Sequence, residues 1–199
     1  MKTISLVLIL SFLLLFRGCG PSFQPPEDLV KFAVTYKNDT FSPPEVEWYC
    51  SKEEWMERLG LSEGEIEHFT EYNVKEYDDC YRLKDEVEFG SPRCKAVLIY
   101  RFQHDILYGK ELRVYQSQQD RSLKEIAPEI AAGLRNIPLP EKTFDGSLEE
   151  LGNYGKVSWQ TKNKSVLFVY CSELPDHSDS MIQFVISASP AAFGKHLKE

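Results

Sequence analysis

The chain has 199 residues, of which 42% are hydrophobic, 13% aromatic and 27% charged, and its formal net charge is −8. This apolar and aromatic content excludes an intrinsically disordered chain, and the length suits one domain with a substantial core. The negative net charge argues against a nucleic-acid-binding protein, which normally carries a basic patch.

The first 18 residues have the pattern of a signal peptide. Lys2 supplies a positive charge, and residues 4–16 are apolar apart from two serines. A 13-residue helix is about 20 Å long, which is short of the roughly 30 Å hydrocarbon core of a bilayer. The run is therefore typical of a signal peptide rather than of a membrane-spanning helix.

Gly18 and Cys19 follow Arg17 at the end of this apolar run. A glycine directly before a cysteine at this position resembles the lipobox of bacterial lipoproteins. The resemblance implies that Cys19 carries lipid as the first residue of the mature chain, tethered by residues 19–26 to a membrane of the bacterial cell envelope. Two alternatives stay open: ordinary signal-peptidase cleavage that releases a soluble secreted protein, and an uncleaved leader that stays in the membrane.

Export would place the other four cysteines in an oxidising compartment. Cys50, Cys80, Cys94 and Cys171 form no Cys-x-x-Cys pair, and no histidine lies near them in the sequence, so we expect no metal site. We expect two disulfides instead. The favoured pairing is Cys50–Cys80 with Cys94–Cys171, and the competing pairing is Cys80–Cys94 with Cys50–Cys171.

An acidic helical lobe is expected over residues 27–92. Gly60 has the position of a helix-ending glycine and stands between two capping boxes. The two capping boxes are Ser51 with Glu54 and Ser62 with Glu65. Together these signals predict an αα-hairpin over residues 51–73.

The pattern changes to period two near residue 93, which predicts a second lobe over residues 93–190 and a tail at residues 191–199. Strands are expected at 95–103, 110–117, 156–161, 166–171 and 181–188, and a helix at 122–136. This ββαβββ order predicts an antiparallel sheet with one packed helix, and hence an α+β fold.

The excess negative charge lies in one part of the chain. Residues 45–88 contain 15 acidic and 5 basic residues, while the rest of the chain from Cys19 onward contains 16 of each. Such a concentration predicts a surface that attracts a cationic protein, with exposed aromatic side chains as anchors. The candidate partner-binding residues are Glu63, Glu67, Glu71, Tyr72 and Tyr77. The alternative is an acidic surface that only keeps the protein soluble.

Common catalytic motifs are missing from the sequence. It contains no Gly-x-Ser-x-Gly, no His-Glu-x-x-His, no phosphate-binding glycine loop and no EF-hand spacing. His177 stands among polar residues that are typical of an exposed loop. We therefore expect no enzymatic activity, no cofactor and no metal.

These observations favour a membrane-tethered lipoprotein that binds or inhibits a cationic protein, as an immunity protein does. The first alternative is a structural or assembly lipoprotein of the cell envelope that makes its contacts through the β-sheet. A hydrolase whose catalytic residues come from distant positions is the third hypothesis.

Overall fold

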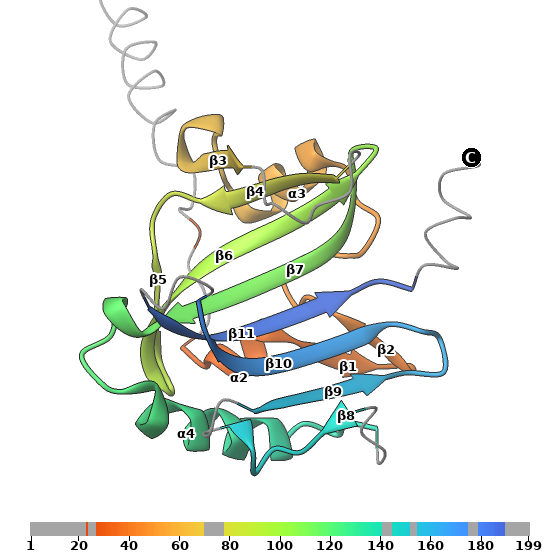
Figure 1. Cartoon of the computed structure of the whole chain (residues 1–199). Coiled ribbons are helices and arrows are strands. Elements are labelled where there is room, and N and C mark those ends of the chain that lie inside the picture. Colours follow the sequence, from red (N-terminus) through yellow and green to blue (C-terminus); the bar gives the residue numbers. More distant parts are fainter. Residues whose placement is uncertain are drawn as a thin grey trace, which may run out of the picture.

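The computed structural model describes residues 23, 27–69, 78–140, 145–151, 155–174 and 179–189 (Figure 1). The signal peptide, Cys19, Glu71, Tyr72 and Tyr77 lie outside the described residues. The elements are α2 (Leu29–Ala33), β1 (Thr35–Lys37), β2 (Thr40–Ser42), α3 (Lys52–Leu59), the 3₁₀ helix η2 (Glu63–Glu65), β3 (Ile66–Phe69), β4 (Asp78–Leu83), β5 (Val87–Gly90), β6 (Arg93–Gln103), β7 (Ile106–Tyr115), η3 (Gln116–Gln118), α4 (Leu123–Arg135), β8 (Asp145–Gly146), β9 (Lys156–Gln160), β10 (Val166–Glu173) and β11 (Ser180–Ser187).

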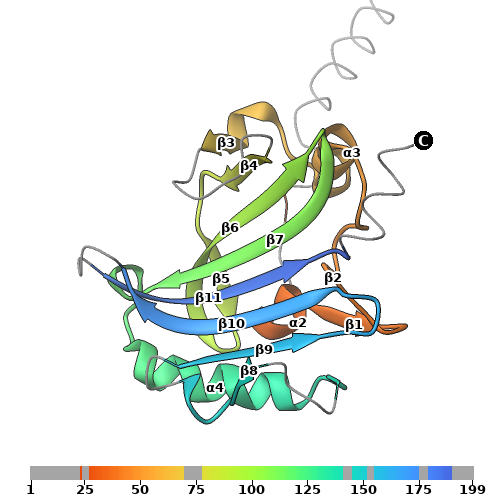
Figure 2. The same ribbon diagram turned by 45° about the vertical axis from the view of Figure 1, so that its right-hand side comes forward.

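The fold is α+β, with helices packed around a mostly antiparallel sheet. The described strands of this sheet follow the order β3-β4-β6-β7-β11-β10-β9-β8, and β5 pairs with β6 beside β4. Figure 2 shows the strong twist of the sheet between β6 and β9, as expected from the right-handed twist of strands. From residue 93 the observed element order is ββαββββ, because β8 adds a two-residue strand after α4.

The expected αα-hairpin over residues 51–73 is wrong in its second half. α3 forms as predicted, since Ser51 and Glu54 make the capping box and Gly60 ends the helix with a φ of 63°. The second capping box starts only the 3₁₀ turn η2, because Ile66 leaves the helix and pairs with Leu83 as the first residue of β3. A capping box satisfies the donors of a first turn and does not set helix length.

The described residues of the segment 27–92, which was expected to be helical, form strands as well as helices. β3, β4 and β5 all come from this part of the chain, and all join the sheet that also contains β6 to β11. Period-two alternation in short strands such as β5, whose residues are alternately buried and exposed, carries too little signal beside strong capping motifs.

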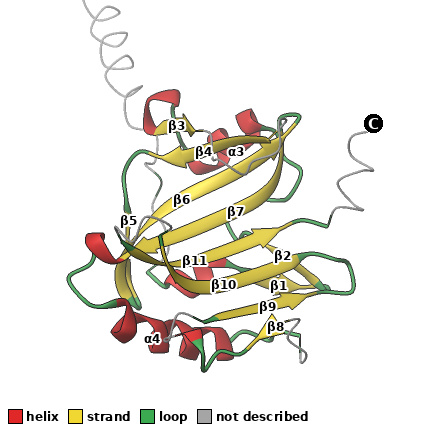
Figure 3. Ribbon diagram, viewed as in Figure 1, coloured by secondary structure: helices red, strands yellow, loops and turns green. Residues whose placement is uncertain are grey.

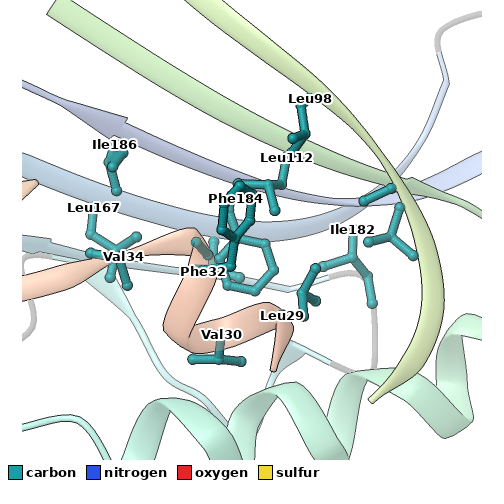
Figure 4. Packing of buried hydrophobic residues seen from close by; sticks show 14 of the residues in the cluster. Leu29, Val30, Phe32, Val34, Leu98, Leu112, Leu167, Ile182, Phe184 and Ile186 are labelled. Atoms are coloured by element: carbon teal, nitrogen blue, oxygen red, sulfur yellow. The ribbon is translucent and has the colours of Figure 1, made fainter. Parts of the chain in front are cut away.

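The core lies between one face of the sheet, here called the core face, and the helices. Phe32 from α2 and Val34 next to it pack against Leu112, Phe184 and Ile186 of the sheet (Figure 4). α3 lies at the end of the molecule near β4, and α4 lies at the opposite end near β8 and β9 (Figure 3). We call the opposite side of the sheet the outer face.

No disulfide joins the described cysteines, which contradicts both expected pairings. All four are buried. The backbone of Cys50 is hydrogen-bonded to Leu107 of β7, so two further strands separate it from Cys80 on β4. Likewise β11 and β7 stand between Cys171 on β10 and Cys94 on β6. Three strand spacings amount to about 14 Å, twice the Cα separation that a disulfide tolerates.

The second pairing, Cys80–Cys94 with Cys50–Cys171, is ruled out by separations along the strands. Cys80 lies opposite Arg101, seven residues from Cys94 on β6, which is roughly 23 Å. Cys171 pairs with Ile182 at the far end of β7 from the residues that contact Cys50. Burial raises the pKa of the Cys50 thiol to about 11 and that of the Cys94 thiol to about 12, so both stay protonated near neutral pH.

Candidate protein-binding surface

Next to β6, the sheet is interrupted where β4 gives way to β5. Pairing with β6 stops at Arg82, opposite Ile99, and resumes at Val87, opposite Ala96. The four residues 83–86 therefore lie alongside only two residues of β6, 97 and 98. Leu83 still pairs with Ile66 of β3, and residues 84–86 connect the end of β4 to the start of β5. We call residues 84–86 the β4–β5 connection.

A cleft of about 380 Å³ opens beside the β4–β5 connection. Lys84 holds the β4–β5 connection against η2, since its backbone N–H donates to the carbonyl of Glu65 (2.9 Å) and its Nζ donates to the carbonyl of Gly64 (2.6 Å). The cleft has four apolar lining residues, Phe23, Leu61, Leu83 and Val87, and four acidic ones, Glu65, Asp85, Glu86 and Glu88. We call it the acidic cleft.

The acidic cleft belongs to a wider acidic surface around α3, η2, β3 and the β4–β5 connection. Its carboxylate side chains are all exposed. The acidic surface comprises Glu47, Glu53, Glu54, Glu57, Glu63, Glu65, Glu67, Asp79, Asp85, Glu86 and Glu88. Figure 1 places α3, β3 and β4 together at one end of the molecule.

Several of these carboxylates already have a cationic partner. Glu63 accepts a hydrogen bond from Lys52 Nζ at 2.9 Å, and Glu67 accepts from Arg82 Nη2 at 2.7 Å. Glu47 pairs with Arg58 at 3.6 Å. The two described candidates from the sequence, Glu63 and Glu67, are thus partly neutralised by the protein itself.

Other acids are open to an external partner. Within the described part of the chain, Glu53, Glu57, Asp85 and Glu86 form no ion pair. Asp85 and Glu86 are in the β4–β5 connection at the acidic cleft, whereas Glu53 and Glu57 are on α3. The unpaired charge is therefore split between an apolar cleft and an open helix surface.

Glu65 has a fixed position at the rim of the acidic cleft. Its Oε2 accepts hydrogen bonds from the backbone N–H of Ser62 at 2.8 Å and from Ser62 Oγ at 2.6 Å. These hydrogen bonds, that of the Ser62 side chain above all, lower the pKa of Glu65, so its negative charge persists into mildly acidic conditions.

A second polar cluster is buried on the core face. Lys110 Nζ, which has no exposed surface, donates to Glu45 Oε2 at 2.9 Å and to the carbonyl of Phe32 at 2.6 Å. Tyr100 Oη donates to Glu45 Oε1 at 2.7 Å. Burial lowers the pKa of Lys110 to about 8, against the opposing effect of Glu45. Because Lys110 is sealed in the core, this cluster ties the chain before α3 to the sheet and presents no reactive group to a ligand.

A third cluster lies on the outer face. Glu111, which is 2% exposed, accepts from Arg101 Nε at 2.5 Å and from Arg113 Nη2 at 2.7 Å, and also from Gln183 Nε2 at 2.7 Å. Phe168 of β10 adds a 38% exposed ring to this face. The outer face therefore combines satisfied charges with apolar surface.

Neither a metal centre nor a membrane-spanning helix is found in the described ranges. Their His, Cys, Asp and Glu side chains do not gather in groups of three or more that would hold a metal ion. No helix in these ranges is both long enough and apolar enough to cross a bilayer.

Asp85 and Glu86 were not among the residues expected from the sequence. Their only sequence signal is an acidic pair between two short period-two segments, which also fits an ordinary turn. Their position in a cleft depends on β4 and β5 pairing with the same strand, and that is a long-range property.

Comparisons of this chain with protein-family models, with curated proteins and with solved structures find no match. Its function is therefore inferred from the arrangement of its own residues.

Proposed function

We propose that the mature chain is an exported bacterial lipoprotein that binds, and thereby inhibits, a cationic protein at the cell envelope. In this proposal lipid on Cys19 anchors the chain to a membrane, and the acidic surface recognises the partner. The protein acts as a non-enzymatic binding protein of the immunity type, without a cofactor.

The acidic cleft is the observation that carries the proposal. It joins four carboxylates to four apolar side chains, and no lysine or arginine is among the described residues that line it. An apolar floor supplies binding energy that does not depend on salt, and a ring of like charge selects partners of opposite charge and speeds their association. A surface that serves only solubility would not need the apolar floor.

The binding proposal is tested by capturing the full chain, without cross-linking, from detergent-solubilised envelopes of the native host at low salt. We compare the wild type with a variant in which Glu53, Glu57, Asp85 and Glu86 are changed to their amides. The wild type should retain a basic protein, released by moderately raised salt, and the variant should retain about tenfold less. Equal recovery by both proteins, or an acidic partner, would contradict the proposal.

The anchoring proposal has its own measurement, the intact mass of the mature protein from its host. The expected mass is that of a chain beginning at Cys19 with attached lipid. An unmodified shorter chain would instead support the soluble secreted form, and a full-length mass would support the uncleaved anchor.

The outer face supports a second candidate function, an envelope structural or assembly protein. Phe168 exposes a ring there, and the charges around Glu111 are satisfied internally, so a partner on this face would bind through apolar contacts. Its binding would change little with salt, in contrast to binding at the acidic surface.

A further inference from the structure

The acidic cleft has the construction of a side-chain pocket rather than of a flat charged surface. Its volume of about 380 Å³ lies at the low end of the range for sites that hold small molecules, about 300–1,000 Å³. A pocket of this size takes one or two side chains of a protein segment.

The floor of the acidic cleft is held by the core. Leu83 and Val87 are 6% and 7% exposed, so each presents only one edge to the cleft. Phe23 forms another part of the wall and is held by ring contacts: its ring centroid lies 5.8 Å from that of Phe32, which in turn lies 5.6 Å from that of Phe89. A preformed apolar floor binds at a lower entropic cost than one that must be assembled.

The carboxylates at the rim of the acidic cleft differ in whether another side chain already contacts them. Asp85 and Glu86 are exposed and form no ion pair within the described residues, and Glu65 is oriented by Ser62. Glu88 faces Lys95 at 3.5 Å, a loose surface contact of little energetic weight. An occupant therefore meets uncompensated negative charge around an apolar centre.

We propose that the acidic cleft receives an apolar side chain of the partner that is flanked in sequence by lysine or arginine. This inference rests on the proposed function and gives it a location and a recognition rule. The apolar side chain fills the space above Leu83 and Val87, and the flanking cations pair with Asp85 and Glu86. Charge complementarity selects this occupant over an acidic or neutral segment of equal hydrophobicity.

Two labelled ten-residue peptides of identical charge test the rule. One alternates lysine with leucine and the other alternates lysine with serine, and their dissociation constants are measured by fluorescence anisotropy at about 50 mM and 300 mM salt. The leucine peptide should bind about tenfold more tightly than the serine peptide, because only its side chains fill the apolar floor.

Two double variants with the same charge change locate the site. Asp85→Asn with Glu86→Gln removes two charges at the cleft, and Glu53→Gln with Glu57→Gln removes two charges on α3. The cleft variant should weaken binding of the leucine peptide about tenfold, and the α3 variant about twofold or less. Leu61→Asn provides a third readout, since it should reduce the preference for leucine while leaving the affinity for the serine peptide unchanged.

The outcomes separate this inference from the proposed function. Equal weakening by both double variants, with no preference for leucine, would overturn the cleft and leave a diffuse acidic surface as the binding site. If neither variant changes the affinity and both peptides bind no better than an uncharged peptide, the cleft and the proposed function fail together.

Discussion

Lys110 is buried because of its position in β7, although lysine side chains are usually exposed. Lysine is almost never fully buried unless it is paired. Leu112 and Val114 on the same strand are 1% and 0% exposed, and side chains two positions apart share a face, so Lys110 points into the core. Glu45 and the carbonyl of Phe32 supply the oxygens that its ammonium group needs.

Replacing Lys110 alone should be more damaging than replacing both members of its pair. Lys110→Met leaves the Glu45 carboxylate, whose side chain is 11% exposed, without its cation, and should lower the free energy of unfolding by about 3 kcal/mol. The double variant with Glu45→Gln should recover at least half of this loss. Urea denaturation near pH 7 gives both values, and a double variant less stable than the single one would refute the argument.

Lys110→Met also isolates the contribution of Lys110 to the pH dependence of stability. Its pKa is about 8 in the folded chain, below the ordinary 10.5, so the unfolded state binds more protons between these values. The stability that Lys110 contributes therefore rises with pH through this window, and the difference between wild type and Lys110→Met should widen. Cys50 and Cys94 oppose the trend in absolute stability because their pKa values are raised. A difference that stays constant with pH would exclude the shift.

At the scale of elements, the contact of α2 with α4 depends on one glycine. A methyl group on Gly133 of α4 would lie 2.9 Å from Cγ2 of Val30, a short β-branched side chain that is 2% exposed. The close approach of the two helices thus needs a residue without a side chain at this position.

Gly133→Ala should destabilise the fold even though alanine is the better helix former. Helix propensity favours alanine by about 1 kcal/mol, while overpacking of a tight contact costs about 1–3 kcal/mol, so we expect a net loss of about 1 kcal/mol. Gly64→Ala is the control, because its methyl group would meet only Ser62 Oγ at 3.7 Å. Thermal unfolding compares the two, and a higher melting temperature for Gly133→Ala would show that α2 yields easily.

The elements that the sequence predicts well are those with local signals. The helix expected at 122–136 forms as α4, Leu123–Arg135, and the strand expected at 181–188 forms as β11, Ser180–Ser187. β3 was missed because the capping box before it resembles a helix start, and because its strand character comes from pairing with β4. The expected disulfides failed for the same reason, since register and strand order decide which cysteines meet.

For the candidate site too, local sequence signals did not reveal which side chains meet in the fold. The charge count located the acidic surface, because net charge is a property of composition. It did not separate Asp85 and Glu86, which are unpaired, from Glu63 and Glu67, which Lys52 and Arg82 neutralise. That distinction arises from side chains brought together across 11 to 15 residues of sequence.

At the scale of the whole molecule, the charge is distributed unevenly enough to oppose folding. Residues 45–88 carry 15 acidic and 5 basic residues, and the described part of this segment gathers around α3, β3 and β4. Repulsion among like charges destabilises a compact state, and salt screens it. Surface ion pairs such as Lys52–Glu63 act in the opposite direction, but each contributes only about 0–1 kcal/mol.

Repulsion should therefore dominate the response of stability to salt. Raising the salt from about 20 to 300 mM should increase the melting temperature by about 2–4 °C, which corresponds to about 1 kcal/mol for a chain of this size. The variant with amides at Glu53, Glu57, Asp85 and Glu86 should melt higher at low salt and respond less to added salt, because these four carboxylates have no ion pair to lose among the described residues. A melting temperature that falls with salt would mean that the ion pairs outweigh the repulsion, and the acidic surface would then be a self-compensated network with little charge left for a partner.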